Sequence, residues 1–138
     1  MCVYDLNDSF FEKDVYEKCK NELEERKLYT NVFNCVSKYA DILEMLGCKV
    51  AYGYLEVEKG LYLRMPLMVR KGRVVDINRQ LYEVQEKNRY YVFKEMNIEE
   101  YANRVVDAQG DASLKESLKE QEEVINKRLE EKGVTIIK

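Results

Sequence analysis

Three runs of strand-forming residues follow one another between residues 49 and 77, and they constrain the fold most. Residues 49–58 alternate apolar with other side chains, residues 61–71 are rich in Leu, Met and Val, and residues 73–77 form a shorter run. Glycines at positions 60 and 72 fall in the gaps, where they permit tight turns. The pattern predicts consecutive antiparallel strands, and Pro66, the only proline, indicates an edge or a bulge in the middle one.

Helical patterns precede these strands. Apolar residues at three- and four-residue spacing predict one helix over residues 9–26 and a second from residue 30 or 31 to 46. Gly47 follows the second helix as a natural C-cap. The tyrosine-rich run 90–96 predicts a further strand, and the polar stretch before it, from residue 80 to 88, predicts a short helix or loop.

The last third of the chain is predicted to be mainly helical. Asn97 and Ser113 are each followed three positions later by Glu, which is the capping-box pattern, and they predict helices over about 97–108 and 113–132. Residues 134–137 can add a short terminal strand. We therefore expect an α+β fold, with N-terminal helices packed on an antiparallel sheet of about four strands and with helices at the C-terminal end.

Length and composition favour one folded domain over residues 1–138, with a core over about 30–96 and a C-terminal helical part over 97–132. The net charge is −3 although 36% of the residues are charged, and no basic face emerges, which argues against nucleic-acid binding. No apolar run approaches the roughly 20 residues of a membrane span, and no secretory signal is apparent. We expect a cytoplasmic protein that does not bind a membrane.

The four cysteines are expected to be reduced in that compartment, and their spacing lacks the close pairs of zinc sites. We expect no metal and no cofactor. Cys35 is the cysteine of interest because it falls in the first turn or so of the second predicted helix, where unpaired amides and the helix dipole favour a thiolate. The simpler alternative is that Cys35 packs beside Val32 and Val36 as a small apolar residue.

Several short motifs occur in a familiar order: Asn34-Cys35, Leu46-Gly47, the strand Ala51–Tyr54, and the run from Gly72 through Asp76 to residue 78. Together they resemble the transglutaminase-like branch of the papain-like cysteine hydrolases. The resemblance implies a papain/transglutaminase-like core, with Cys35 as nucleophile and Asp76 as the carboxylate that orients the base.

The residues that would complete such a site are missing. The family's histidine position falls on Met65 and its tryptophan position on Leu67, and the chain has no histidine at all. Loss of one member of a catalytic triad costs several orders of magnitude in rate. The resemblance therefore implies a degenerate member, a pseudoenzyme whose Cys35 and Asp76 are vestigial, and in which Asp76 can instead cap backbone amides.

A scaffold that has lost its chemistry can still bind. Eleven tyrosines and no tryptophan are present, and tyrosine suits binding surfaces because it adds contact area and a hydroxyl at low entropic cost. The candidate ligand-binding residues are Asn34, Tyr52, Tyr54 and Arg64. Tyr62, Tyr90 and Tyr91 are further candidate wall residues, and the alternative for these tyrosines is that they face solvent or fill the rim of the core.

The predicted function is a non-catalytic protein that binds a partner protein or a small ligand. By analogy, it would suit an inhibitor of host defence carried by a phage or mobile element. Two alternatives stay open: a thiol enzyme that uses Cys35 with an unusual base, and a structural subunit that forms homo-oligomers through the 113–132 helix. Docking of that helix on its own core is the simpler interpretation of its apolar seam.

Overall fold

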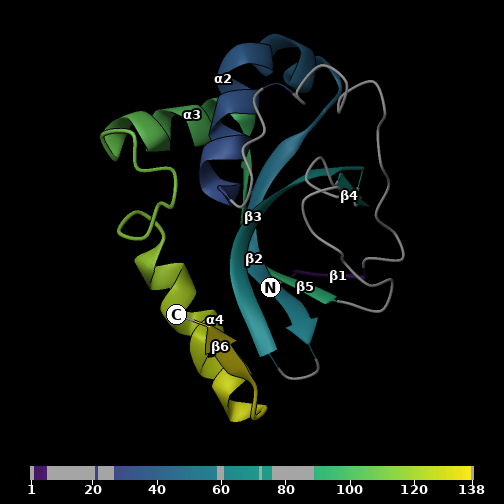
Figure 1. The fold of residues 1–138 in the computed structure, drawn as a ribbon, viewed down its shortest axis with the longest axis vertical. Coiled ribbons are helices and arrows are strands. Elements are labelled where there is room, and N and C mark those ends of the chain that lie inside the picture. Colours follow the sequence, from purple (N-terminus) through teal and green to yellow (C-terminus); the bar gives the residue numbers. More distant parts are fainter. Residues whose placement is uncertain are drawn as a thin grey trace.

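The computed structural model describes residues 2–5, 21, 27–58, 61–71, 73–75 and 89–137. Over these residues the protein is an α+β fold in which helices gather on one side of a curved sheet (Figure 1). The predicted helix 9–26, apart from residue 21, lies outside the described residues, as do the stretch 80–88 and Asp76.

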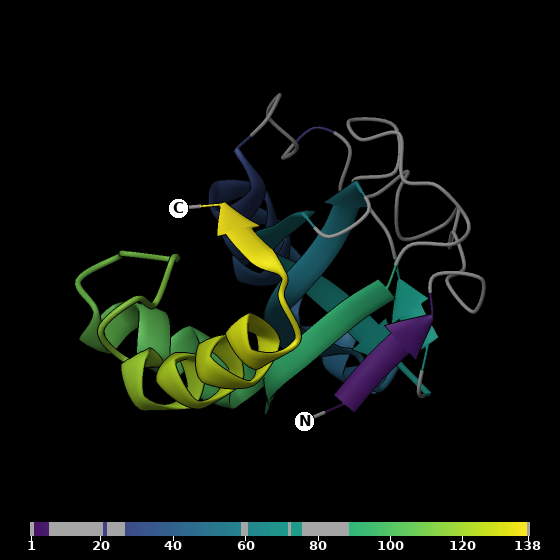
Figure 2. The same ribbon diagram turned by 90° about the horizontal axis from the view of Figure 1, so that it is seen from below.

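Three long antiparallel strands form the body of the sheet: β2 (Lys49–Glu58), β3 (Leu61–Arg70) and β5 (Arg89–Asn97). Three short strands lie at its margins: β1 (Cys2–Asp5), β4 (Arg73–Val75) and β6 (Thr135–Ile137). The order is β1-β5-β2-β3-β4, and β6 also pairs with β3, in parallel. The expected count of about four strands is therefore wrong in detail: three strands are long, the strand expected at 73–77 is only the short β4, and β1 was not predicted. Figure 2 shows β1 and β6 on opposite flanks of the long strands.

Among the described strands, β4 and β6 pair with the outer edge of β3, one at each end. Its first residues, 61–63, pair with β6, and its last, 68–70, pair with β4. Pro66 lies in the interval between them, where its missing N–H breaks no pairing with either short strand. The predicted edge position of Pro66 is confirmed.

A bulge sets the relation between β2 and β5. The pairing shifts between Tyr52 and Gly53, which leaves Phe93 as the extra residue on β5. At Gly53 the two backbones approach so closely that a Cβ atom would lie 2.3 Å from the carbonyl oxygen of Tyr91. The ring of Tyr90 also passes over this glycine, and its hydroxyl donates to the carbonyls of Met65 (2.6 Å) and Ala51 (3.1 Å).

Helix α2 (Leu28–Met45) packs its apolar stripe on the sheet. Val32, Val36 and Leu43 are buried along it, as the spacing predicted. The helix ends in a Schellman motif, in which Cys48 N–H donates to the Leu43 carbonyl and Gly47 N–H donates to the Glu44 carbonyl. Gly47 has a φ of +75°, so the predicted C-cap is confirmed.

Helix α3 (Ile98–Asp107) begins as predicted, with the Asn97 side chain accepting a hydrogen bond from Glu100 N–H at 2.7 Å. The capping box predicted at Ser113 is wrong. Its N–H and hydroxyl both bind the carboxylate of Asp111, residues 112–118 form turns, and α4 begins only at Lys119 and runs to Glu131. A local side-chain hydrogen bond has here replaced a helix start.

All three described helices lie on the same side of the sheet (Figures 1 and 2). Helices α2 and α3 pack over one end, and α4 packs over the other through Ile125 and Leu129. The seam of the predicted 113–132 helix is therefore buried within the chain: Leu114, Leu118, Ile125 and Leu129 are at most 3% exposed. Docking of this seam on the chain's own core is therefore the arrangement observed.

Candidate functional site

Cys35 does not lie where a nucleophile would. Helix α2 begins at Leu28, so Cys35 is about two turns inside it rather than in the first turn. Its side chain is completely buried, in an apolar cluster with Val50 and Met68 of the sheet, and it forms no disulfide. The packing alternative for Cys35 is the one observed.

Met65 lies on the other side of the sheet from Cys35. Side chains alternate along a strand, so Met65 and Met68 of β3 point to opposite faces. Met68 belongs to the cluster that contains Cys35, whereas Met65 packs with Leu55 and Val92 in a separate cluster. Cys35 and Met65, the residue at the family's histidine position, therefore do not share a site. Leu67 shares the face of Met65, and Asp76 is outside the described residues.

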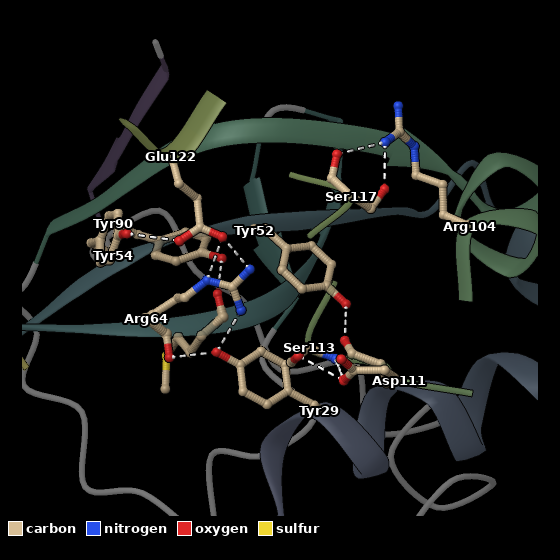
Figure 3. A network of polar contacts seen from close by, with 12 residues as sticks. Tyr29, Tyr52, Tyr54, Arg64, Tyr90, Arg104, Asp111, Ser113, Ser117 and Glu122 are labelled. Atoms are coloured by element: carbon tan, nitrogen blue, oxygen red, sulfur yellow. Dashed lines mark hydrogen bonds and ion pairs between the residues drawn. The ribbon is translucent and has the colours of Figure 1, made fainter. Parts of the chain in front are cut away.

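Three of the four predicted ligand-binding residues do come together. Tyr52, Tyr54 and Arg64 lie on the helix-covered face, where they form a connected group with Tyr29 of α2 and Glu122 of α4 (Figure 3). Phe93 of β5 also contacts Arg64. We call this group the Arg64 cluster: Tyr29, Tyr52, Tyr54, Arg64, Phe93 and Glu122. The fourth predicted residue, Asn34, does not belong to this group. It lies about 140° around the axis of α2 from Tyr29, which is the α2 residue that contacts Arg64.

Aromatic rings surround the guanidinium of Arg64. Its Cζ atom lies 5.4 Å from the ring centroids of Tyr29 and Tyr52 and 5.8 Å from that of Phe93, within the range of cation–π attraction. The Arg64 Nη1 atom also donates to the Tyr29 hydroxyl at 2.8 Å, and that hydroxyl contacts the Arg64 carbonyl at 3.3 Å. The guanidinium is held in one orientation by these contacts.

The carboxylate of Glu122 completes the cluster. Arg64 donates to its Oε1 atom through both Nε, at 2.9 Å, and Nη2, and the Tyr54 hydroxyl donates to Oε2 at 3.1 Å. The side chains of Arg64 and Glu122 are 9% and 15% exposed. Both carboxylate oxygens thus accept hydrogen bonds in a nearly dry setting, as in a charge-assisted ion pair within the chain.

The electrostatics keep Arg64 charged and the tyrosines around it neutral. Burial alone would lower the pKa of Arg64, but its hydrogen bonds with Glu122 and Tyr29 raise that pKa above the usual value. Burial raises the pKa of Tyr29, Tyr52 and Tyr54, and the charge of Glu122 raises that of Tyr54 further. The tyrosines therefore act as hydrogen-bond donors and aromatic walls, not as bases, at neutral pH.

The other predicted wall tyrosines are buried too. Tyr62 and Tyr91 pack edge to face beneath α4, with ring centroids 5.3 Å apart, whereas Tyr90 occupies the opposite face of the sheet. These five tyrosines, at positions 52, 54, 62, 90 and 91, thus fill the interior, and the alternative in which they face solvent is wrong.

Sequence reasoning missed Glu122, Tyr29 and Phe93. Glu122 stands three positions before Ile125 and seven before Leu129, so it lies on the same face of α4 as these apolar residues. That spacing could have indicated that Glu122 faces the sheet. Phe93 enters the cluster because the bulge turns it toward the helices, which no local pattern reveals.

A second, open groove lies between α3 and the turns before α4. Four of its nine lining residues are acidic: Glu99, Glu100, Asp107 and Glu116. Arg104 also lines the groove, and its guanidinium binds Ser117. Within the described ranges, no cysteine and carboxylate side chains group closely enough to hold a metal ion. None of the described helices is both long enough and apolar enough to cross a bilayer.

Comparison of the chain with protein-family models, with curated proteins and with solved structures finds no match.

Proposed function

We propose that this chain is a non-catalytic binding protein that recognises a carboxylate group of its ligand through the Arg64 cluster. The observation that carries the proposal is the geometry of that cluster, in which a caged guanidinium and a tyrosine hydroxyl satisfy both oxygens of one carboxylate. The buried, mid-helix position of Cys35 supports the non-catalytic part.

The energetics of buried ion pairs support a role in recognition. Replacing such a pair with apolar side chains of similar volume is often neutral or stabilising by about 1–4 kcal/mol. Apolar residues would therefore hold α4 at least as firmly as Arg64 and Glu122 do. A charged, hydrogen-bonded pair gives selectivity instead, because an oxyanion such as a carboxylate satisfies donors that an apolar group leaves unpaired.

The resemblance to transglutaminase-like proteins suggests an origin for this scaffold. A degenerate member that keeps a rigid sheet and loses its triad would be free to bind without catalysis. Inhibition of host defence on behalf of a phage or mobile element is a role that such a binder could fill, by analogy only.

Chemical rescue tests whether the cluster accepts an external carboxylate. Glu122→Ala removes the internal carboxylate and leaves Arg64 unpaired, which should lower the melting temperature. Acetate should then raise the melting temperature of this variant more than an equal concentration of chloride does, because acetate binds the folded state alone.

Two matched variants control this experiment. Glu123→Ala makes the same charge change on an exposed neighbouring residue and should not respond to acetate. The double variant Arg64→Met/Glu122→Ala should lose the response because the guanidinium is absent. Equal effects of acetate and chloride on Glu122→Ala would contradict the proposed function.

A further inference from the structure

Helix α4 contacts the sheet through a single stripe of side chains. Glu122, Ile125 and Leu129 stand at positions i, i+3 and i+7 and so share one face of the helix. Glu122 binds Arg64 and Tyr54, and the two apolar residues pack with Tyr54, Tyr62 and Tyr91. The sheet therefore presents a guanidinium next to an apolar, tyrosine-lined surface, which α4 matches with a carboxylate followed by two apolar side chains.

The match between α4 and this surface is incomplete. Its N-cap residue, Leu118, supplies no side-chain hydrogen bond to the first turn. The Oδ1 atom of Asn126 is buried without a hydrogen-bond partner among the described residues, and Val124 is 57% exposed. A buried acceptor without a donor weakens the docked state, so a helix that lacked this defect could compete with α4.

We propose that the face of the sheet beneath α4 is a docking site for an amphipathic helix of a partner protein. That helix carries a carboxylate followed three and seven positions later by apolar side chains, and α4 is the chain's own occupant of the site. The inference rests on the proposed function and adds the class of partner and its regulation. The partner helix binds only as α4 leaves, so α4 keeps the site closed in the partner's absence.

Charge and geometry select this occupant. A carboxylate in the first turn of a helix is favoured by the helix dipole, and Glu122 occupies the first turn of α4. An extended peptide would present alternate residues instead and could not offer side chains at three- and seven-residue spacing from one face. A helix tethered in the same chain also has a high effective concentration, so the unaltered protein should bind a competing helix weakly.

The α4 segment itself provides a defined probe. A fluorescent peptide with the sequence of residues 116–131 would be titrated into the full-length Glu122→Ala variant, in parallel with a peptide in which Gln replaces Glu122. We expect the Glu peptide to bind about ten-fold tighter than the Gln peptide, as one charge-assisted hydrogen-bond set implies. The unaltered protein should bind both peptides weakly, and Arg64→Met/Glu122→Ala should bind them equally.

Hydrogen exchange on the unaltered protein gives a second readout that needs no variant. Excess Glu peptide should speed exchange of the α4 amides and leave those of α3 unchanged, whereas the Gln peptide should do so far less. Equal binding of the two peptides to Glu122→Ala, or no selective effect on α4 exchange, would overturn the inference. Acetate rescue without peptide selectivity refutes this inference alone, whereas failure of acetate rescue refutes the proposed function.

Discussion

Gly53→Ala should destabilise the protein strongly, because the added methyl group has no room between β2 and β5. The new Cβ atom would lie 2.3 Å from the Tyr91 carbonyl oxygen and 3.0 Å from Cε1 of the Tyr90 ring. Favourable non-bonded carbon contacts lie at about 3.5–4.0 Å, so β5 would have to move by roughly 1 Å. That movement would also disturb the hydrogen bonds of the Tyr90 hydroxyl to Met65 and Ala51.

The expected cost follows from these contacts. Overpacking costs about 1–3 kcal/mol, and each weakened hydrogen bond adds about 1 kcal/mol, so the total is about 3–5 kcal/mol. For a chain of this length the melting temperature should fall by roughly 10 °C. Urea unfolding and a thermal scan, both followed by far-UV circular dichroism, measure the two quantities.

Gly47→Ala is the matched control. Gly47 has a φ of +75°, and a Cβ atom there would meet nothing within 4 Å, so only the backbone conformation is disfavoured, at about 1–2 kcal/mol. In an open extended segment, Gly→Ala instead stabilises by about 0.4–1 kcal/mol through the unfolded chain. A Gly53→Ala variant that is as stable as Gly47→Ala, or more stable than the unaltered protein, would refute the close approach of β2 and β5.

Three further outcomes are expected. Arg64→Met and Glu122→Gln should each lower the free energy of unfolding by about 3 kcal/mol, because each leaves a nearly buried charge unpaired. In urea unfolding, the double variant should lose about 2 kcal/mol less than the sum of the two single losses. Strict additivity would show that the pair is not coupled. Cys35 should resist iodoacetamide in the folded protein and react after unfolding, because its thiol is buried. Peptide mapping of the alkylated site measures this reactivity. Rapid alkylation of the thiol in the folded protein would support the alternative of a thiol enzyme. Burial raises the pKa of Tyr52 and Tyr54. Above about pH 10 the unfolded chain therefore releases its phenolic protons before the folded chain does, and the free energy of unfolding should fall as the pH rises. A constant unfolding midpoint across this range would contradict the burial of these two tyrosines.

Local patterns predicted most of the elements. The bounds of β2 were predicted to the residue, and the ends of α2 and α3 were placed correctly by Gly47 and by the break after residue 108. These features depend on side-chain alternation and on glycine's left-handed backbone, which neighbouring residues determine. The start of α4 was wrong because Ser113 bonds to Asp111 rather than to a helix amide.

The candidate site was harder to predict because it depends on which face each side chain takes. Residues 65–69 are apolar and buried at every position, so the sequence does not reveal that Met65 points away from Cys35. The partner of Arg64 is 58 positions away in the chain, and that separation is settled only by how α4 docks. The tyrosine-rich strands predicted a binding surface, but in the structure α4 covers Tyr54, Tyr62 and Tyr91, and the sequence did not show which strands this helix would cover.

The most direct test of a carboxylate site at Arg64 is the NMR signal of its Nε–H group. In the unaltered protein this proton is hydrogen-bonded to Glu122 and nearly buried, so a sharp, slowly exchanging resonance is expected. The resonance should broaden or vanish in Glu122→Ala and return when acetate is added. A signal that is the same in all three samples would contradict the account, because the guanidinium would then not depend on any carboxylate.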